Sequence, residues 1–181
     1  MSDSLALVLG GTRSGKSAHG LALTRRLSGT GRAWFLATSQ PGDPELDRRI
    51  ERHRRQRPAD WPTVEVGMDL AGAIAGTEPT EPVLVEGLTL WLSLLAGDEP
   101  ADPDPILDGP LADAMAMIAA RPGPVVIVSD ELGLGLVPMH AGARAFRDLV
   151  GLAHQRIGAE AHTVDFVVAG QPLRVKGPPD P

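Results

Sequence analysis

Residues 10–17 read Gly-Gly-Thr-Arg-Ser-Gly-Lys-Ser, and this run constrains the fold more than any other part of the chain. It matches G-x-x-x-x-G-K-[ST], the phosphate-binding loop, without a mismatch. Gly10 and Gly15 allow the backbone to curl so that successive N–H groups point at phosphate oxygens. Lys16 can reach the β- and γ-phosphates, and the Ser17 hydroxyl can bind Mg²⁺. The motif predicts a nucleoside-triphosphate site but does not identify a reaction.

The segments on either side of this loop support the match. Residues 5–9 form a short apolar run that is typical of a buried parallel strand, and residues 18–27 read as a helix. The alternative is a chance glycine turn, which would not require this order of strand, loop and helix. We therefore expect the whole loop to contact the nucleotide: Gly10, Gly11, Thr12, Arg13, Ser14, Gly15, Lys16 and Ser17.

Strand and helix signals alternate along the rest of the chain, which predicts an α/β fold with a mainly parallel sheet flanked by helices. We expect one nucleotide-binding catalytic domain over 1–176, a mobile surface loop over 97–110 and a disordered tail at 177–181. The further predicted elements are strands at 33–37, 82–86 and 124–129, helices at 44–57, 88–96, 111–120 and 143–161, and a hairpin of 163–169 with 173–176.

Composition excludes several classes of function. The formal net charge is −6, which argues against binding to nucleic acid or to anionic membranes. No cysteine is present, so disulfides and thiolate metal sites are excluded, and a cytoplasmic location is expected. No apolar run is long enough to span a membrane.

Glu86 ends the apolar strand at 83–86, and acidic side chains at the carboxyl ends of parallel strands are placed to hold Mg²⁺. A helix-capping or solvated glutamate is the alternative. Asp130 and Glu131 follow the strand at 124–129 in the same way, and they are further candidates for the metal or for an attacking water.

A second signal is an arginine-rich segment with a histidine inside it. Six of the ten residues from 48 to 57 are arginine. At helical spacing Leu46, Ile50, His53 and Arg57 share one face, so His53 is expected to point toward the protein. The surrounding guanidinium groups would keep its imidazole neutral and nucleophilic. A solvated basic face, an RNA patch and a structural histidine are the alternatives, and the net negative charge counts against RNA.

At this point the chain resembles a known family, the cobinamide kinase / cobinamide-phosphate guanylyltransferase enzymes. The resemblance extends over nearly the whole chain and is carried by residues 10–17, 37–40, 49–53, 57–58, 61, 63–65, 85–91, 129–135 and 143–148. The sequence departs from the family pattern at Leu21, Gly87, Leu94, Met139 with His140, and His154. Most of these departures lie in the later half, where the corrinoid is expected to contact the protein.

The resemblance implies two reactions. An NTP, either ATP or GTP, phosphorylates a hydroxyl of adenosylcobinamide, and GTP then donates GMP to that phosphate through a histidine-GMP intermediate. It implies Mg²⁺ as cofactor, a RecA-like phosphate-loop fold and a homotrimer. His53 matches the nucleophilic histidine, with Lys16 as the second catalytic residue. Nucleotide contacts map onto residues 10–17, Ala37, Thr38, Ser39, Arg54, Arg55, Gln56, Arg57, Glu65 and Glu86, with Ser17 and Glu86 at the metal.

Other classes stay open on the sequence. A small-molecule kinase without nucleotidyl transfer would need the phosphate loop but not His53. A GTP-controlled switch would need a guanine-specificity motif such as Asn-Lys-x-Asp, which is absent. An ATP-driven nucleic-acid motor would need a basic channel, and the net charge argues against one.

Overall fold

The computed structural model describes residues 5–29, 31–38, 59–97 and 102–178, and every structural statement below concerns these residues. Their strands form one seven-stranded sheet in the order β3-β2-β4-β5-β1-β6-β7. All neighbouring strands are parallel except β6 and β7, which form an antiparallel hairpin. The strands are β1 Leu5–Gly10, β2 Trp34–Ala37, β3 Thr63–Glu65, β4 Val83–Glu86, β5 Val125–Asp130, β6 Thr163–Val168 and β7 Gln171–Lys176.

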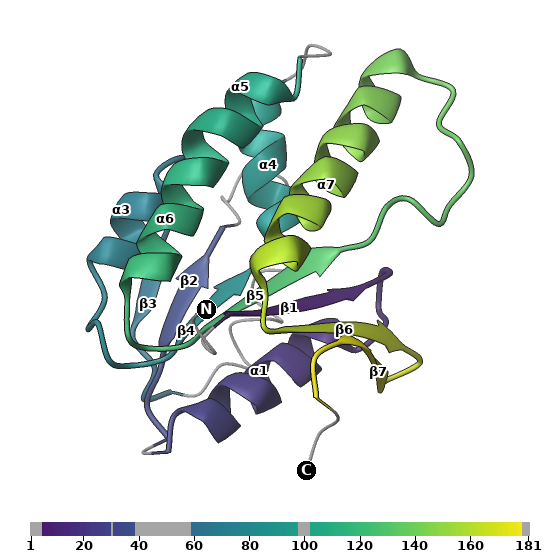
Figure 1. The fold of residues 1–181 in the computed structure, drawn as a ribbon. Helices are drawn as coiled ribbons and strands as arrows, with labels where there is room; N and C mark the ends of the chain where they lie inside the picture. The colour runs from purple at the N-terminus through teal and green to yellow at the C-terminus, as the bar shows by residue number, and fades with distance from the viewer. Residues whose placement is uncertain (1–4, 30, 39–58, 98–101, 179–181) are drawn as a thin grey trace.

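Helices cover both faces of this sheet and give the molecule three layers (Figure 1). Helix α1 lies on one face, and the other described helices lie on the opposite face. The fold is a P-loop NTPase fold of the RecA-like type, as the sequence predicts. The helices are α1 Lys16–Leu27, α3 Leu70–Ala75, α4 Leu88–Ala96, α5 Asp104–Ile106, α6 Ala112–Ala120 and α7 Ala141–Glu160.

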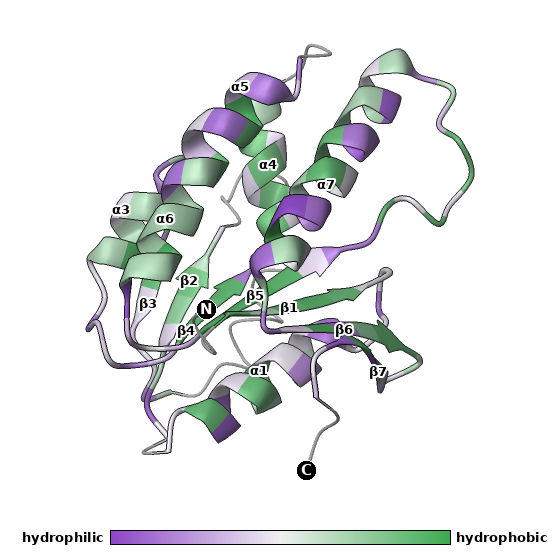
Figure 2. Cartoon of the chain, in the orientation of Figure 1, coloured by the Kyte–Doolittle hydropathy of each residue, from purple (hydrophilic) through white to green (hydrophobic). Residues whose placement is uncertain are grey.

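The core follows from the alternation of side chains along the strands. Leu5 and Leu7 of β1 pack into the larger cluster beneath α4, α6 and α7, whereas Ala6 and Val8 pack into a second cluster on the face of α1. Because both faces are buried, the central strands are apolar throughout, and Figure 2 shows β1 and β5 in the hydrophobic colour along most of their length. Helix α7 instead alternates between polar and apolar residues (Figure 2), as expected for a helix with one face in water.

The prediction of a loop over 97–110 is wrong in its second half. Residues 104–111 are helical and continue into α6, with a wider π-helical turn at Leu107–Leu111. Ile106, Leu107 and Leu111 are buried in the larger cluster, and this burial stabilises the helical conformation. The π-helical turn accommodates Pro110, whose missing N–H would break a regular α-helix.

Two short elements are absent from the sequence prediction. Strand β3 has three residues and lies at the edge of the sheet, and α3 has six residues, with Asp69 accepting a hydrogen bond from the Gly72 N–H at its start. Elements this short carry too few residues for a periodic pattern. The predicted helix at 44–57 lies outside the described residues. Among the described helices, none has the length and apolar character needed to cross a bilayer.

Candidate nucleotide-binding site

The phosphate-binding loop connects β1 to α1 at the carboxyl edge of the sheet. Gly15 precedes the helix in the left-handed conformation, with φ of 99°, where a side chain would be strained. A Cβ on Gly10 would lie 2.4 Å from Ser14 Oγ and 2.7 Å from the carbonyl oxygen of Val167. Both predicted glycine requirements are therefore met by the geometry of the loop.

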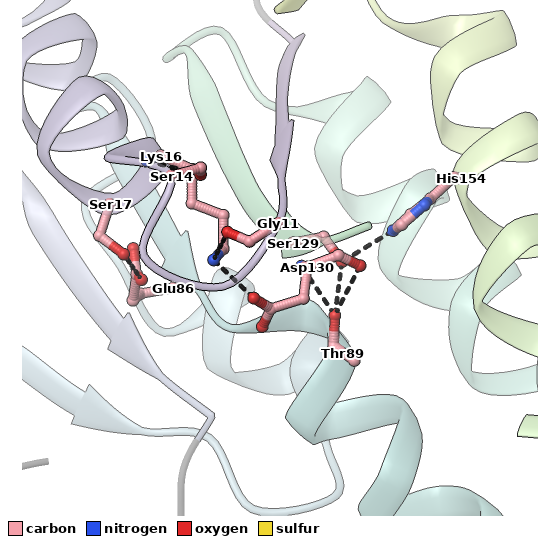
Figure 3. Close-up of polar contacts among 9 residues, drawn as sticks. All are labelled: Gly11, Ser14, Lys16, Ser17, Glu86, Thr89, Ser129, Asp130 and His154. Atoms are coloured by element: carbon pink, nitrogen blue, oxygen red, sulfur yellow. Dashed lines mark hydrogen bonds and ion pairs between the residues drawn. The ribbon is translucent and has the colours of Figure 1, made fainter. Parts of the chain in front are cut away.

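The side chain of Lys16 is buried and lies against the loop that precedes it (Figure 3). Its Nζ donates a hydrogen bond to the Gly11 carbonyl oxygen at 3.2 Å and lies 2.5 Å from Asp130 Oδ1 at the end of β5. The ammonium group therefore faces the concave side of the loop, where the motif places the phosphates. An ammonium group in contact with Asp130 also disfavours a divalent cation on that carboxylate.

Ser17 and Glu86 form the second contact between the loop and the sheet. The Ser17 hydroxyl donates a hydrogen bond to Glu86 Oε1 at 2.6 Å (Figure 3). The described residues contain no group of three or more acidic, histidine or cysteine side chains suited to a metal. A hydroxyl and a carboxylate fit Mg²⁺, because this ion binds proteins through one or two oxygen ligands and takes the others from phosphates and water.

Three predicted nucleotide residues occupy one register position at the carboxyl ends of adjacent strands. Ala37 of β2 pairs with Glu65 of β3 on one side and with Glu86 of β4 on the other. Thr38 follows directly, and its hydroxyl donates to the carbonyl oxygens of Glu86 and Gly87. Parallel pairing therefore brings together residues from three separate regions of the chain. Glu65 is exposed, so its side chain lies at the surface of this edge.

The hairpin of β6 and β7 contacts the loop from the other side. The Gly170 N–H, in the hairpin turn, donates to the Ser14 carbonyl oxygen at 2.7 Å. Behind it, the buried Asp165 of β6 lies 2.7 Å from His19 Nε2 and accepts a hydrogen bond from Arg174 Nε. Burial would raise the pKa of Asp165, but the hydrogen bonds from His19 and Arg174 outweigh it and hold that pKa below its usual value. The ionised carboxylate thus ties α1 to the hairpin.

A buried chain of hydrogen bonds lies beside Asp130 on the opposite face of the sheet (Figure 3). The Asp130 N–H donates to Thr89 Oγ1 at 2.9 Å, Thr89 Oγ1 lies 2.9 Å from Ser129 Oγ, and Ser129 Oγ lies 2.8 Å from His154 Nε2. Burial lowers the pKa of His154, although the carboxylates of Glu131 and Asp130 act in the opposite direction. The neutral imidazole is therefore favoured.

Sequence reasoning missed this buried chain and the Asp165 contacts. The only signals are polar residues within otherwise apolar segments, namely Ser129 after residues 125–128 and Asp165 after Val164. The departures from the family pattern are scattered: Leu21 packs beside the α1-face cluster, Gly87 has φ of 92°, Met139 is exposed and His154 is buried. The predicted Ser39, His53, Arg54, Arg55, Gln56 and Arg57 all lie outside the described residues.

Comparison with family models matches residues 6–175 to the family described as cobinamide kinase / cobinamide phosphate guanyltransferase. The chain belongs to this family. Its members are enzymes, and the match includes every site residue predicted above. The resemblance seen in the sequence is therefore confirmed.

Curated relatives match over almost their whole length. The chain is 41% identical over 177 residues to the bifunctional adenosylcobalamin biosynthesis protein CobP of Pseudomonas aeruginosa, covering 96% of this chain and 98% of that protein. It is 37% identical over 183 residues to the bifunctional adenosylcobalamin biosynthesis protein CobU of Escherichia coli K12, covering 95% and 99%.

Solved structures resemble the chain in fold alone. The flagellar accessory protein FlaH of Methanocaldococcus jannaschii superposes with a TM-score of 0.51 at 10% identity, covering 97% of this chain and 79% of that one. A second solved structure, which is an ATPase domain, gives a TM-score of 0.50 at 14% identity, covering 91% and 69%.

Proposed function

We propose that this protein catalyses both reactions that its family name describes. In the first, the phosphate-binding loop holds an NTP whose γ-phosphoryl group is transferred to a hydroxyl of adenosylcobinamide. In the second, GMP from GTP is transferred to the resulting phosphate to form adenosylcobinamide-GDP and pyrophosphate. The observation that carries the proposal is the assembled loop, with Lys16 against its backbone and Ser17 in contact with Glu86, in a chain that matches the family over residues 6–175.

The described residues supply binding and charge stabilisation for both steps. Backbone N–H groups of residues 10–17 and the start of α1 bind the phosphates, and Lys16 offsets the charge that develops on them. Mg²⁺, held by Ser17 and Glu86, would neutralise charge on the triphosphate. Thr38 and Ala37 lie beside Glu86 at the same edge, where they can contact the nucleotide.

The nucleophile proposed for the second reaction is His53, as the family resemblance implies. A ring nitrogen of His53 attacks the α-phosphorus of GTP, a P–N bond forms, and the bond to pyrophosphate breaks. An oxygen of the acceptor phosphate then attacks the same phosphorus and releases the imidazole. Arg54, Arg55 and Arg57 would offset charge on the α-phosphate and the leaving pyrophosphate.

A labelling experiment tests this division of roles. The protein is incubated with α-labelled GTP and Mg²⁺, and a covalent label that acid removes and mild alkali spares is expected. His53→Ala should lose the label, whereas His140→Ala, a change at an exposed histidine, should retain it. Label retained by His53→Ala would place the nucleophile elsewhere. No label in the parent protein, together with intact phosphorylation of cobinamide, would identify a kinase without nucleotidyl transfer.

We also propose a homotrimer in the cytoplasm, on the strength of the family resemblance and the composition. Apolar side chains that are 65–97% exposed at Leu134, Leu136, Val137 and Met139 leave surface available for a partner. Light scattering on the purified protein should give three times the chain mass of 19.0 kDa. A mass equal to one chain would contradict the trimer.

A further inference from the structure

The carboxylate of Asp130 is placed where the first reaction needs a proton acceptor. Attack by a hydroxyl group on a γ-phosphoryl releases a proton, and a positioned carboxylate can accept it. Asp130 ends β5, between the strand that carries the phosphate-binding loop and the strand that carries Glu86. Its Oδ1 lies 2.5 Å from Lys16 Nζ. A phosphate oxygen bound to the same ammonium group at about 2.8 Å would lie within roughly 5–6 Å of this carboxylate.

The other acidic side chains near the loop have different surroundings. Glu86 accepts the hydrogen bond of Ser17 and is assigned to the metal. Glu131 accepts a hydrogen bond from the Gly133 N–H and lies 3.5 Å from the buried His154. The sequence contains no tyrosine that could act instead. Among the described carboxylates at this edge, Asp130 is the one in contact with the phosphate-binding lysine.

The backbone of Asp130 is held from the opposite face of the sheet. Its N–H donates to Thr89 Oγ1, which contacts Ser129 Oγ, which contacts His154 Nε2 (Figure 3). Because adjacent strand residues point to opposite faces, Ser129 turns toward α4 and α7 while the Asp130 side chain turns toward Lys16. All three supporting side chains are buried, so the end of β5 is held by contacts that do not involve the nucleotide.

We propose that Asp130 is the proton acceptor of the kinase reaction, and that Thr89, Ser129 and His154 are positioning residues for it. This inference rests on the proposed function. When the triphosphate binds, Lys16 moves its hydrogen bonds to the phosphates. The substrate oxygen then forms a bond to the γ-phosphorus, and the bond from the γ-phosphorus to the β-bridging oxygen breaks. The hydroxyl proton passes to the Asp130 carboxylate, and the electron pair of the broken bond stays on the departing nucleoside diphosphate.

The two reactions of the family provide an internal control. The acceptor of the second reaction is a phosphate group, which is already ionised at neutral pH and needs no proton acceptor. Both reactions use Lys16 and the same loop. If Asp130 only positioned Lys16, its loss would slow both reactions alike. If Asp130 accepts the proton, its loss slows the first reaction and spares the second.

The experiment measures both reactions with Asp130→Asn, a change that keeps the size of the side chain. Phosphorylation of adenosylcobinamide should fall at least about 100-fold in kcat with little change in KM, as expected for loss of a general base. Transfer of GMP to adenosylcobinamide phosphate, supplied directly, should stay within about threefold. Asp130→Glu should recover part of the phosphorylation, and Ser129→Ala should lower its kcat without altering GMP transfer. Thermal unfolding confirms that each variant is folded.

Each other outcome has a defined meaning. Equal losses in both reactions, or no loss in either, would overturn the assignment of Asp130. A parent protein that transfers GMP but never phosphorylates adenosylcobinamide would overturn it as well, since no kinase reaction would exist. A parent protein inactive in both reactions would instead contradict the proposed function itself.

Discussion

Ser17 donates a hydrogen bond of 2.6 Å to Glu86 across 69 positions of sequence. Ser17 lies in the first turn of α1, just after the phosphate-binding loop, and Glu86 ends β4, two strands away from β1 in the sheet. The contact places the two oxygen donors of the proposed Mg²⁺ site together.

From this contact we predict that Glu86→Gln raises the Mg²⁺ concentration needed for half-maximal activity. The neutral amide binds the ion more weakly, and we expect an increase on the order of 10-fold or more. Mg²⁺ titrations of phosphoryl transfer measure it. Glu81→Gln is the matched control, because Glu81 accepts a hydrogen bond from Trp34 Nε1 and can do so as an amide. An unchanged Mg²⁺ requirement in Glu86→Gln would remove Glu86 from the metal site.

Replacement of Lys16 by alanine should lower kcat for phosphoryl transfer about 10²- to 10³-fold, because the charge that develops on the transferred group loses its cation. Steady-state rates with γ-labelled NTP measure the loss. Lys176→Ala is the matched control, since Lys176 donates to the carbonyl oxygens of Gly158 and Ala159 at the end of α7. A similar loss in both variants would point to a general effect on stability.

Gly10→Ala should destabilise the fold by about 1–3 kcal/mol, because the added Cβ would overlap Ser14 Oγ and the Val167 carbonyl oxygen. Nucleotide affinity should fall with it, since the loop must shift. Urea unfolding and equilibrium binding of a fluorescent GTP analogue measure the two effects. Gly151→Ala within α7, where nothing lies within 4 Å of the added Cβ, should instead stabilise the protein by up to about 1 kcal/mol. Equal stability of Gly10→Ala and its parent would refute this steric argument.

The stability of the protein should fall as the pH drops below 6.5, the ordinary pKa of histidine. In the folded protein burial lowers the pKa of His154, so between 6.5 and that lower value the unfolded chain binds a proton that the folded chain does not. The free energy of unfolding should therefore decrease by up to about 1.4 kcal/mol per pH unit in this window. Urea unfolding at several pH values measures the slope.

His154→Asn is the test variant for this slope. It should lose the contribution of this one histidine and show a shallower decrease as the pH falls from 6.5 toward about 5. Asp165 does not confuse the result, because its lowered pKa affects stability only at pH values below the usual range of a carboxylate. Identical slopes in parent and variant would show that His154 binds its proton equally well in both states.

The sequence alone was sufficient for the central sheet and the phosphate-binding loop. Residues 5–9, 83–85 and 125–128 are continuous apolar runs, and such runs form buried parallel strands because both of their faces lie under helices. The loop depends on glycine, lysine and serine at fixed local spacing, and a local requirement can be read locally. Helical residues 104–111 and strand β3 were not predictable, because their conformations depend on packing against distant residues.

Only the tertiary structure decided which polar groups meet. Glu86 could be recognised as a strand-end acid, but its contact with Ser17 follows from the strand order β4-β5-β1. The sequence left Asp130 as one of two weaker candidates, and the structure placed it 2.5 Å from Lys16 with Thr89, Ser129 and His154 behind it. The physical reason is that hydrogen bonds depend on distances of about 3 Å in space. Spacing along the chain determines those distances only within one element.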